Sequence, residues 1–199
     1  MNSNRRSFLL SGAAIAVAGA FGLSRFAKAE NIVGVPGKVR IHQFTDKGKS
    51  IGVVEVDKVV KSDDEWQKQL ASAPVAGDGS TAFKVARQEG TEYPGTGPNW
   101  DNHSAGLYRC ICCDTAVFDS KTKFESGTGW PSFWQPIDAD AVELHEDKSL
   151  FMRRTEVTCA RCGGHLGHVF NDGPRPTGER YCMNSVSLQL DPTDEERTS

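Results

Sequence analysis

The sequence predicts a mainly β domain of antiparallel strands with short helices on its N-terminal side. From Leu107 onward the apolar segments are short and are separated by Gly, Pro, Asn and Asp, a pattern typical of all-β chains. Two short helical patterns begin earlier, at Ser62 and near Ser80. Two C-x-x-C pairs, at residues 110–113 and 159–162, indicate that a metal ion stabilises the fold.

Residues 1–29 are expected to be an export signal and to take no part in the fold. Arg5-Arg6 is followed by a soft apolar run from Phe8 to Leu23, and Ala27-Lys28-Ala29 is a small-residue cleavage pattern. Paired arginines are typical of twin-arginine export, so we expect a periplasmic or otherwise exported protein. The apolar run of 16 residues is short for a membrane-spanning helix. An uncleaved membrane anchor is the alternative.

The net charge of the mature chain limits the classes of partner that it is expected to bind. Cleavage after Ala29 would leave 19 basic against 26 acidic residues, a net charge of −7. Nucleic acids and anionic membranes are bound through clustered positive charge. We therefore expect no nucleic-acid partner and no stable membrane association after cleavage. The mature length of 170 residues suits one domain, and we expect a monomer.

An N-terminal extension over residues 30–61 is predicted to form a β-hairpin. Polar and apolar residues alternate over 38–44 and again over 51–60, and residues 46–49 supply a turn between the two runs. The main domain is then expected to cover residues 62–190.

Two short helices and a tail complete the expected elements. Ser62-Asp63-Asp64-Glu65 fits a capping box and opens a helix through Leu70. Ser80 is expected to cap a second helix that stops at Gly90. The charged tail, residues 191–199, is predicted to be disordered.

The two cysteine pairs, Cys110-Ile111-Cys112-Cys113 and Cys159-Ala160-Arg161-Cys162, are separated by 45 residues. Two such turns bring four thiolates to the corners of a tetrahedron, the geometry of a closed, structural Zn²⁺ site. Cys112 does not fit a two-residue spacer. The predicted ligands of one structural Zn²⁺ are Cys110, Cys113, Cys159 and Cys162. Two disulfides, or a single redox C-x-x-C, are the alternatives.

Cys182 is a further thiol with a chemical environment of its own. It lies in Arg180-Tyr181-Cys182-Met183-Asn184-Ser185, and residues 181–190 alternate like a strand. A nearby cation favours the thiolate, so Arg180 could make Cys182 a nucleophile. A buried, inert cysteine is the alternative that this segment alone leaves open.

Two more segments favour Cys182 as a nucleophile over Cys182 as an inert residue. They are His165-Leu166-Gly167-His168-Val169-Phe170-Asn171-Asp172 and Ser126-Gly127-Thr128-Gly129-Trp130-Pro131-Ser132-Phe133. With Gly90-Thr91-Glu92, the cysteine pairs and the Cys182 segment, all in this order, they closely resemble the B-type methionine sulfoxide reductases over residues 62–190. The resemblance implies two antiparallel sheets in a β-tent type, barrel-like body. It also implies a peptide-methionine (R)-S-oxide reductase, which reduces methionine R-sulfoxide, peptide-bound or free, to methionine.

The resemblance also implies roles for individual residues. Cys182 matches the nucleophile, which attacks the sulfoxide sulfur and becomes a sulfenic acid. The implied catalytic residues are Cys182, His168, His165, Asn184, Arg180 and Asp172, and the implied substrate-binding residues are Trp130 and Phe170. This chemistry is reasonable, because a leaving oxygen needs a nearby acid and a methyl group suits an aromatic wall.

The two histidines cannot both face the site on a regular strand, because they are three residues apart. Either one of them is structural, or Gly167 marks a bulge. We prefer His168 as the acid.

The chain differs from many members of this family at residue 128, where a second, resolving cysteine is replaced by Thr128. Cys112 is the remaining candidate for that role, and the alternative is that it is a buried residue beside the metal. We therefore expect a thioredoxin-like external thiol to reduce the Cys182 sulfenic acid, in the repair of oxidised exported proteins and peptides.

Two other functions stay open at this point. One is a zinc-stabilised binding module without chemistry, because a fold alone does not determine function. The other is an enzyme for a different oxidised thiol or thioether. Convergence of Cys182, His168, Asn184 and Trp130 on one pocket would favour an enzyme over a binding module.

Overall fold

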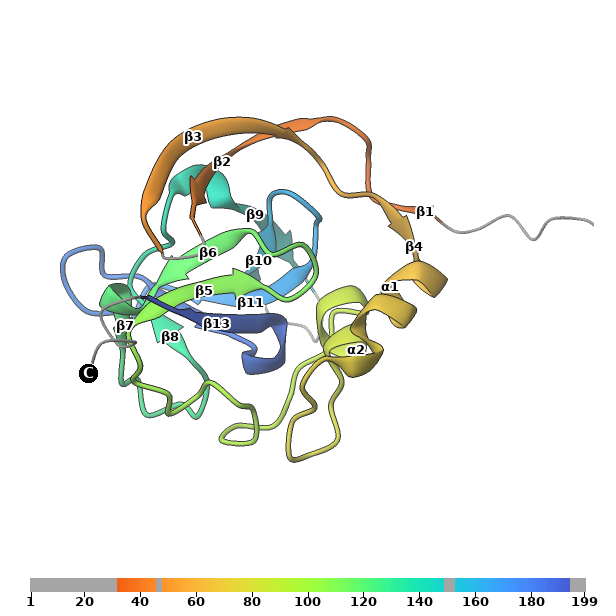
Figure 1. The fold of residues 1–199 in the computed structure, drawn as a ribbon. Coiled ribbons are helices and arrows are strands. Elements are labelled where there is room, and N and C mark those ends of the chain that lie inside the picture. The colour runs from red at the N-terminus through yellow and green to blue at the C-terminus, as the bar shows by residue number, and fades with distance from the viewer. Residues whose placement is uncertain (1–31, 46–47, 149–152, 194–199) are drawn as a thin grey trace, which may run out of the picture.

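The computed structural model describes residues 32–45, 48–148 and 153–193, and its main body is two antiparallel sheets (Figure 1). A six-stranded sheet has the order β7-β8-β12-β11-β10-β9, and a three-stranded sheet has the order β13-β5-β6. The predicted mainly β fold with antiparallel sheets is confirmed. The predicted export signal lies outside the described residues. Within them, no helix is long and apolar enough to cross a membrane.

The larger sheet carries most of the residues predicted for the site. Its strands are β7 (Lys123–Phe124), β8 (Ser132–Phe133), β9 (Val142–Asp147), β10 (Arg154–Cys159), β11 (His165–Phe170) and β12 (Arg180–Met183). Cys182 on β12 pairs with His168 on β11 and with Ser132 on β8. The sheet register therefore places the candidate nucleophile beside a candidate acid.

The smaller sheet consists of β5 (Gly106–Cys110), β6 (Ala116–Asp119) and β13 (Leu188–Pro192). Its strand β13 corrects the predicted start of a disordered tail at Asp191. Asp191 pairs with Leu107 in the sheet, and its carboxylate accepts a hydrogen bond from Arg109 Nε at 2.9 Å. The sheet thus continues to Pro192, and residues 194–199 lie outside the described part of the chain.

The predicted strand over residues 181–190 is interrupted. β12 ends at Met183, Asn184 precedes the 3₁₀ turn η5 (Ser185–Ser187), and β13 begins at Leu188. This turn moves the chain from the larger sheet to the smaller one. Asn184 is consequently placed by the turn and not by strand alternation.

Aromatic side chains fill the core between the sheets. Phe133 of β8 stacks on Phe118 of β6 with ring centroids 4.4 Å apart, and Tyr108 of β5 meets Phe133 edge-on at 5.0 Å. All three are fully buried. Because each ring removes a large apolar area from water, this contact holds the two sheets together.

The helices lie beside the sheets at the right of Figure 1. The predicted capping box is confirmed, since Ser62 and Glu65 each satisfy the other's backbone N–H at the start of α1 (Asp63–Gln69), which leads into η1 (Leu70–Ser72). The second helix, α2 (Ala82–Arg87), is capped by Thr81 and not by Ser80. The Ser80 hydroxyl donates to Asp78 instead. The helix also ends at Arg87, before the predicted stop at Gly90.

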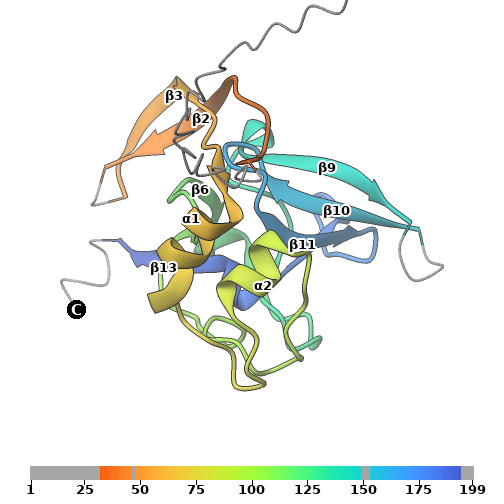
Figure 2. The same ribbon diagram turned by 90° about the vertical axis from the view of Figure 1, so that its right-hand side faces the viewer.

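A two-stranded hairpin, β2 (Lys38–Phe44) and β3 (Ser50–Asp57), arches over the body, as Figures 1 and 2 show. Arg40 pairs with Asp140 at 3.1 Å, next to the 3₁₀ turn η3 (Ala139–Ala141). Buried Ile41 faces the body. The remaining short elements are β1 (Ile32–Val33), which pairs with β4 (Lys61–Ser62), and η2 (Ser120–Thr122).

Candidate active site and metal centre

A bulge in β11 brings the two histidines to one side of the sheet. His165 pairs with Thr158 and Gly167 pairs with the preceding residue, Val157, so Leu166 is extra in the register. The His165 and His168 ring centroids are consequently 5.4 Å apart. Of the two alternatives considered from the sequence, the bulge is the one that the structure contains.

Gly167 is required where the bulge meets β12. Its φ is +155°, and a Cβ atom there would lie 2.2 Å from the Cys182 carbonyl oxygen. Atoms cannot approach so closely, so a side chain would push β11 away from the strand that carries Cys182. The absence of a side chain lets the histidine strand and the cysteine strand pack in direct contact.

The bulge also holds Asn184. The Leu166 carbonyl accepts hydrogen bonds from Asn184 N at 2.7 Å and from its side-chain Nδ2 at 3.3 Å. Asn184 Oδ1 and His165 Nε2 are both buried and have no hydrogen-bond partner among the described residues. Buried polar atoms normally find partners, so these two atoms are candidates for contact with a bound molecule.

A pocket of about 120 Å³ lies at this junction. Five of the residues predicted for the site line it, namely Cys182, His168, Asn184, Trp130 and Phe170. Arg180 and His165 lie outside the lining, and each contacts a ring that lines it, Phe170 and His168 respectively. Asp172 also lies outside the lining and pairs with Arg180. The convergence that would favour an enzyme over a binding module is therefore present.

Opposing influences act on the Cys182 thiol. Burial raises its pKa above the usual value, whereas Thr128, Arg180 and Ser132 act to lower it. Thr128 Oγ1 lies 3.8 Å from Cys182 Sγ. Since desolvation disfavours the charged thiolate, the nearby donors and cation limit the cost of ionising it.

Arg180 is fixed in place beside the thiol. Its Nε and Nη2 atoms donate to the two Asp172 carboxylate oxygens at 2.9 and 2.8 Å. The guanidinium carbon lies 4.4 Å from the Phe170 ring centroid. This bidentate pair lowers the pKa of Asp172, and ring stacking further orients the cation.

Each histidine is oriented by a carboxylate from another strand of the larger sheet, Asp147 of β9 for His168 and Glu156 of the adjacent β10 for His165. His168 Nε2 lies 2.9 Å from Asp147 Oδ2, which also accepts from Arg154 Nη2 at 2.7 Å. His165 Nδ1 lies 2.6 Å from Glu156 Oε1. Burial lowers the pKa of His168, and the hydrogen bond to Asp147 opposes that shift.

Asp147, Arg154 and Glu156 are site residues that the sequence did not predict. No local motif marks them, because their roles come from the alignment of β9, β10 and β11 in the sheet. Glu156 pairs directly with His168 in the strand register, and that pairing could not be read from the chain.

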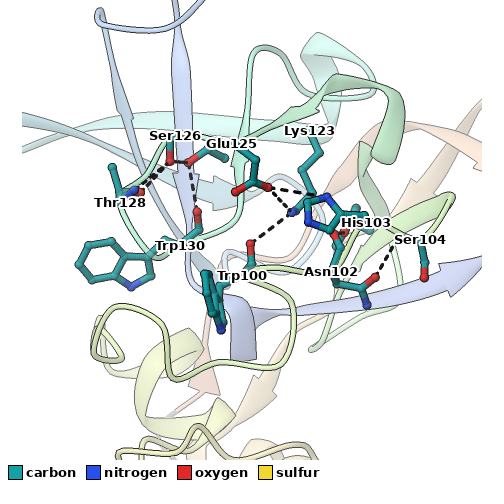
Figure 3. Close-up of polar contacts among 11 residues, drawn as sticks. Trp100, Asn102, His103, Ser104, Lys123, Glu125, Ser126, Thr128 and Trp130 are labelled. Atoms are coloured by element: carbon teal, nitrogen blue, oxygen red, sulfur yellow. Dashed lines mark hydrogen bonds and ion pairs between the residues drawn. The ribbon is translucent and has the colours of Figure 1, made fainter.

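The loop of residues 126–130 forms another wall of the site, because Trp130 lines the pocket and Thr128 lies beside Cys182. Ser126 Oγ lies 2.8 Å from Thr128 Oγ1 and 2.7 Å from Ser132 Oγ. Trp130 Nε1 donates to the Glu92 carbonyl at 3.2 Å. Figure 3 shows Thr128 and Trp130 on one side of this view and the Lys123 and His103 group on the other. Hydrogen bonds thus fix both the threonine and the indole that face the site.

The four predicted metal ligands meet at one point. The Sγ atoms of Cys110, Cys113, Cys159 and Cys162 all lie within 4.8 Å of one another. Cys110 and Cys162 sulfurs are 3.7 Å apart, and Cys113 and Cys159 sulfurs are 3.5 Å apart. A tetrahedral ion with bonds of about 2.3 Å to sulfur places its ligands roughly 3.8 Å apart, so the cluster fits such an ion.

Cys112 belongs to the same region and not to the pocket. Its side chain is buried in the core, and its carbonyl accepts a hydrogen bond from Gln69 at 2.6 Å. A Cβ atom on Gly164 would contact both the Cys112 and the Cys162 sulfur. This position favours a structural role over the role of a resolving thiol.

Comparison with known proteins identifies the family. The SelR domain family matches residues 79–192. This chain belongs to the MsrB family of peptide methionine sulfoxide reductases. The MsrB of Methanosarcina mazei is 51% identical over 142 residues, which are 71% of this chain and 94% of the relative. The MsrB of Hahella chejuensis is 48% identical over 139 residues, 70% and 94% of the two chains.

A plant relative extends the range of the family. The chloroplastic peptide methionine sulfoxide reductase B1 of Oryza sativa subsp. japonica is 53% identical over 133 residues, 66% of this chain and 58% of the relative. The family match covers both cysteine pairs, the 126–130 loop and the Cys182 segment. It begins after the β2–β3 hairpin.

Removal of the metal is expected to destabilise the fold. The cluster joins the end of β5 in the smaller sheet to the end of β10 in the larger one, and without an ion its thiols would be left packed together in the core. We expect Cys159→Ser to lower the midpoint of thermal unfolding by about 10 °C or more, by analogy with other closed metal sites. Differential scanning calorimetry with metal analysis measures this.

Cys182→Ser is the matched control, because it removes a cysteine that lies outside the cluster. It should keep both the metal and the unfolding midpoint. An unchanged midpoint in Cys159→Ser would contradict the structural role of the cluster.

Proposed function

We propose that this chain reduces the R epimer of methionine sulfoxide in oxidised peptides, with Cys182 as the nucleophile. The chain is a peptide-methionine (R)-S-oxide reductase by family, so the proposal concerns how its residues carry out the reaction. The observation that carries it is the pocket in which Cys182, His168, Asn184 and Trp130 meet.

In the proposed reaction, the Cys182 thiolate attacks the sulfoxide sulfur. A bond forms between the two sulfur atoms, and it breaks as the oxygen is passed to the cysteine. The products are methionine and Cys182 sulfenic acid, so the sulfoxide is reduced and the thiol is oxidised. Arg180 assists because its charge opposes the effect of burial on the thiol pKa.

His168 is proposed to protonate the oxygen. It lines the pocket, and its hydrogen bond to Asp147 fixes the ring orientation. A lowered pKa makes the protonated ring a stronger acid, which helps a poor leaving group to depart. His165, whose buried Nε2 has no partner among the described residues, is proposed to hold the oxygen by a hydrogen bond. Asn184 is proposed to donate the second N–H of its Nδ2 to the same oxygen, while the first goes to the Leu166 carbonyl.

The aromatic residues are proposed to recognise the methyl-bearing sulfur. Trp130 and Phe170 are the aromatic residues that line the pocket beside Cys182, and the cavity is small, at about 120 Å³. Aromatic walls exclude water and bind small apolar groups well. Because the methyl and the oxygen then occupy different subsites, only one epimer would present its sulfur to Cys182.

We also propose that an external thioredoxin-like thiol regenerates Cys182. Two external thiols would convert the sulfenic acid to a thiol, with release of water and formation of an external disulfide. Thr128, whose Oγ1 lies 3.8 Å from Cys182 Sγ, stands where the resemblance would place a resolving cysteine. A disulfide between Cys112 and Cys182 after sulfoxide treatment would contradict this proposal.

The metal is proposed to be Zn²⁺ with a structural role. Four cysteine sulfurs at tetrahedral spacing are the donor set of closed zinc sites, which leave no coordination position for substrate. The Zn²⁺ would therefore hold the scaffold, while Cys182 and its neighbours carry out the chemistry. We propose that the protein acts as a monomer, because a single chain provides every residue of the site.

Epimer selectivity tests the proposed reaction. The mature chain with dithiothreitol should convert the R epimer of a methionine sulfoxide peptide and leave the S epimer. Cys182→Ser should lower turnover by about a thousandfold or more, since it removes the attacking atom. Chiral chromatography of the remaining sulfoxide measures both. A folded, metal-loaded chain inactive on both epimers would contradict the proposal.

The pH dependence tests the role of Arg180. Its cation lowers the pKa of Cys182, so Arg180→Gln should raise that pKa and move the rising limb of activity to higher pH. At a pH well below the pKa, a thiol with a higher pKa has a smaller thiolate fraction. Iodoacetamide alkylation of Cys182 across pH measures the change directly. Arg153→Gln, which removes an exposed arginine paired with Glu146, should leave the profile unchanged.

We propose that the chain is exported through the twin-arginine route and repairs oxidised proteins outside the cytoplasm. The support is the Arg5-Arg6 pair, the apolar run and the cleavage pattern that ends at Ala29. Replacing both arginines with lysine should stop processed protein from reaching the periplasm, as cell fractionation would show. Unchanged processing in that variant would contradict the route.

A further inference from the structure

Glu92 is a buried acid that lies outside the pocket lining. Its side chain is 1% exposed, and it is the only buried Asp, Glu, Lys or Arg among the described residues. Burial raises its pKa, and the groups that oppose this rise are backbone N–H groups and not a cation. A carboxylate in such a place costs stability unless it makes strong hydrogen bonds.

The Glu92 carboxylate forms hydrogen bonds to η5, the 3₁₀ turn that follows the strand of Cys182. Its two oxygens accept hydrogen bonds from the backbone N–H groups of Ser185 and Val186, at 2.5 and 3.0 Å. These residues form η5, which begins directly after Asn184. A charged acceptor makes stronger bonds to backbone N–H groups than a neutral one does. Glu92 therefore fixes the backbone that carries Asn184.

The backbone carbonyl of Glu92 holds Trp130, an aromatic residue that lines the pocket. This carbonyl accepts the indole N–H of Trp130 at 3.2 Å. Thr91, the residue before it, lines the pocket. One residue thus connects the side of the pocket that contains Asn184 to the side that contains Trp130.

The fit around this connection is tight. A Cβ atom on Gly97 would lie 2.2 Å from Ser185 Cβ and 2.6 Å from Glu92 Oε1. Asn99 adds further bonds, from its backbone N–H to Ser185 Oγ and from Nδ2 to the Ser185 carbonyl. The segment from Glu92 to Asn99 consequently has little freedom relative to the turn.

We propose that Glu92 is a positioning residue for sulfoxide reduction, an inference that rests on the proposed function. Through its carboxylate it sets where Asn184 meets the sulfoxide oxygen, while its carbonyl separately sets the Trp130 indole. A side-chain substitution alters the carboxylate contact and leaves the carbonyl contact. The two subsites can therefore be separated by experiment.

Glu92→Gln in the mature, metal-loaded chain is the test, with kcat and KM measured on the R-sulfoxide peptide. The amide has one oxygen and one NH₂ group facing two N–H donors, so the turn loses an acceptor. We expect kcat to fall about tenfold, while KM stays within about threefold because the Trp130 contact is retained.

A double-mutant cycle separates positioning from general structural damage. In an Asn184→Ala background, Glu92→Gln should reduce kcat by less than about twofold, because the residue that it positions is already gone. The same tenfold loss in both backgrounds would overturn the proposal, as would a raised KM with unchanged kcat.

Asp78→Asn is the matched control. Asp78 Oδ2 accepts the backbone N–H of Tyr93 at 2.8 Å, so this change loosens the residue next to Glu92 without touching the turn. It should keep wild-type kcat. Glu92→Asp, which shortens the side chain, is measured in parallel, and loss of folding in both Glu92 variants would also overturn the proposal. Wild-type inactivity on both epimers would reject the proposed function, whereas a Glu92→Gln variant with wild-type kinetics rejects the role of Glu92 alone.

Discussion

The direct contact between β11 and β12 at Gly167 is the constraint on which the site depends. Without a side chain at Gly167, the bulge at Leu166 can form against the Cys182 backbone. The bulge turns His165 and His168 to one side, and its carbonyl holds Asn184. One local irregularity therefore arranges the acid, the amide and the thiol around a single small pocket.

The electrostatic arrangement follows from burying that pocket. Burial makes the Cys182 thiolate and the His168 imidazolium harder to form, since both are charged. Arg180 opposes the first effect and Asp147 the second. Asp172 holds Arg180 from a largely exposed position, whereas Asp147 is mostly buried beside His168. The chain thus keeps the reactive groups in a partly buried pocket and places their counter-charges beside them.

Local chemistry was predictable from the sequence, whereas contacts between distant segments were not. The capping box at Ser62 and the four-cysteine cluster depend on short spacings, and both are found in the structure. The prediction of Ser80 as the cap of the second helix was wrong, because the Ser80 hydroxyl donates to Asp78 and Thr81 caps the helix instead. Asp147 and Glu92 reach the site only through strand pairing and loop packing. Glu92 lies in the Gly90-Thr91-Glu92 segment of the resemblance, but that segment alone gave it no role.

The most direct test of Cys182 as the nucleophile is a single turnover without added reductant, followed by trapping with dimedone and peptide mass spectrometry. We expect about one methionine formed per chain and a dimedone adduct on Cys182 alone, because one thiol accepts one oxygen. Methionine formation with an adduct on another cysteine, or with a Cys112–Cys182 disulfide in place of the adduct, would contradict this mechanism.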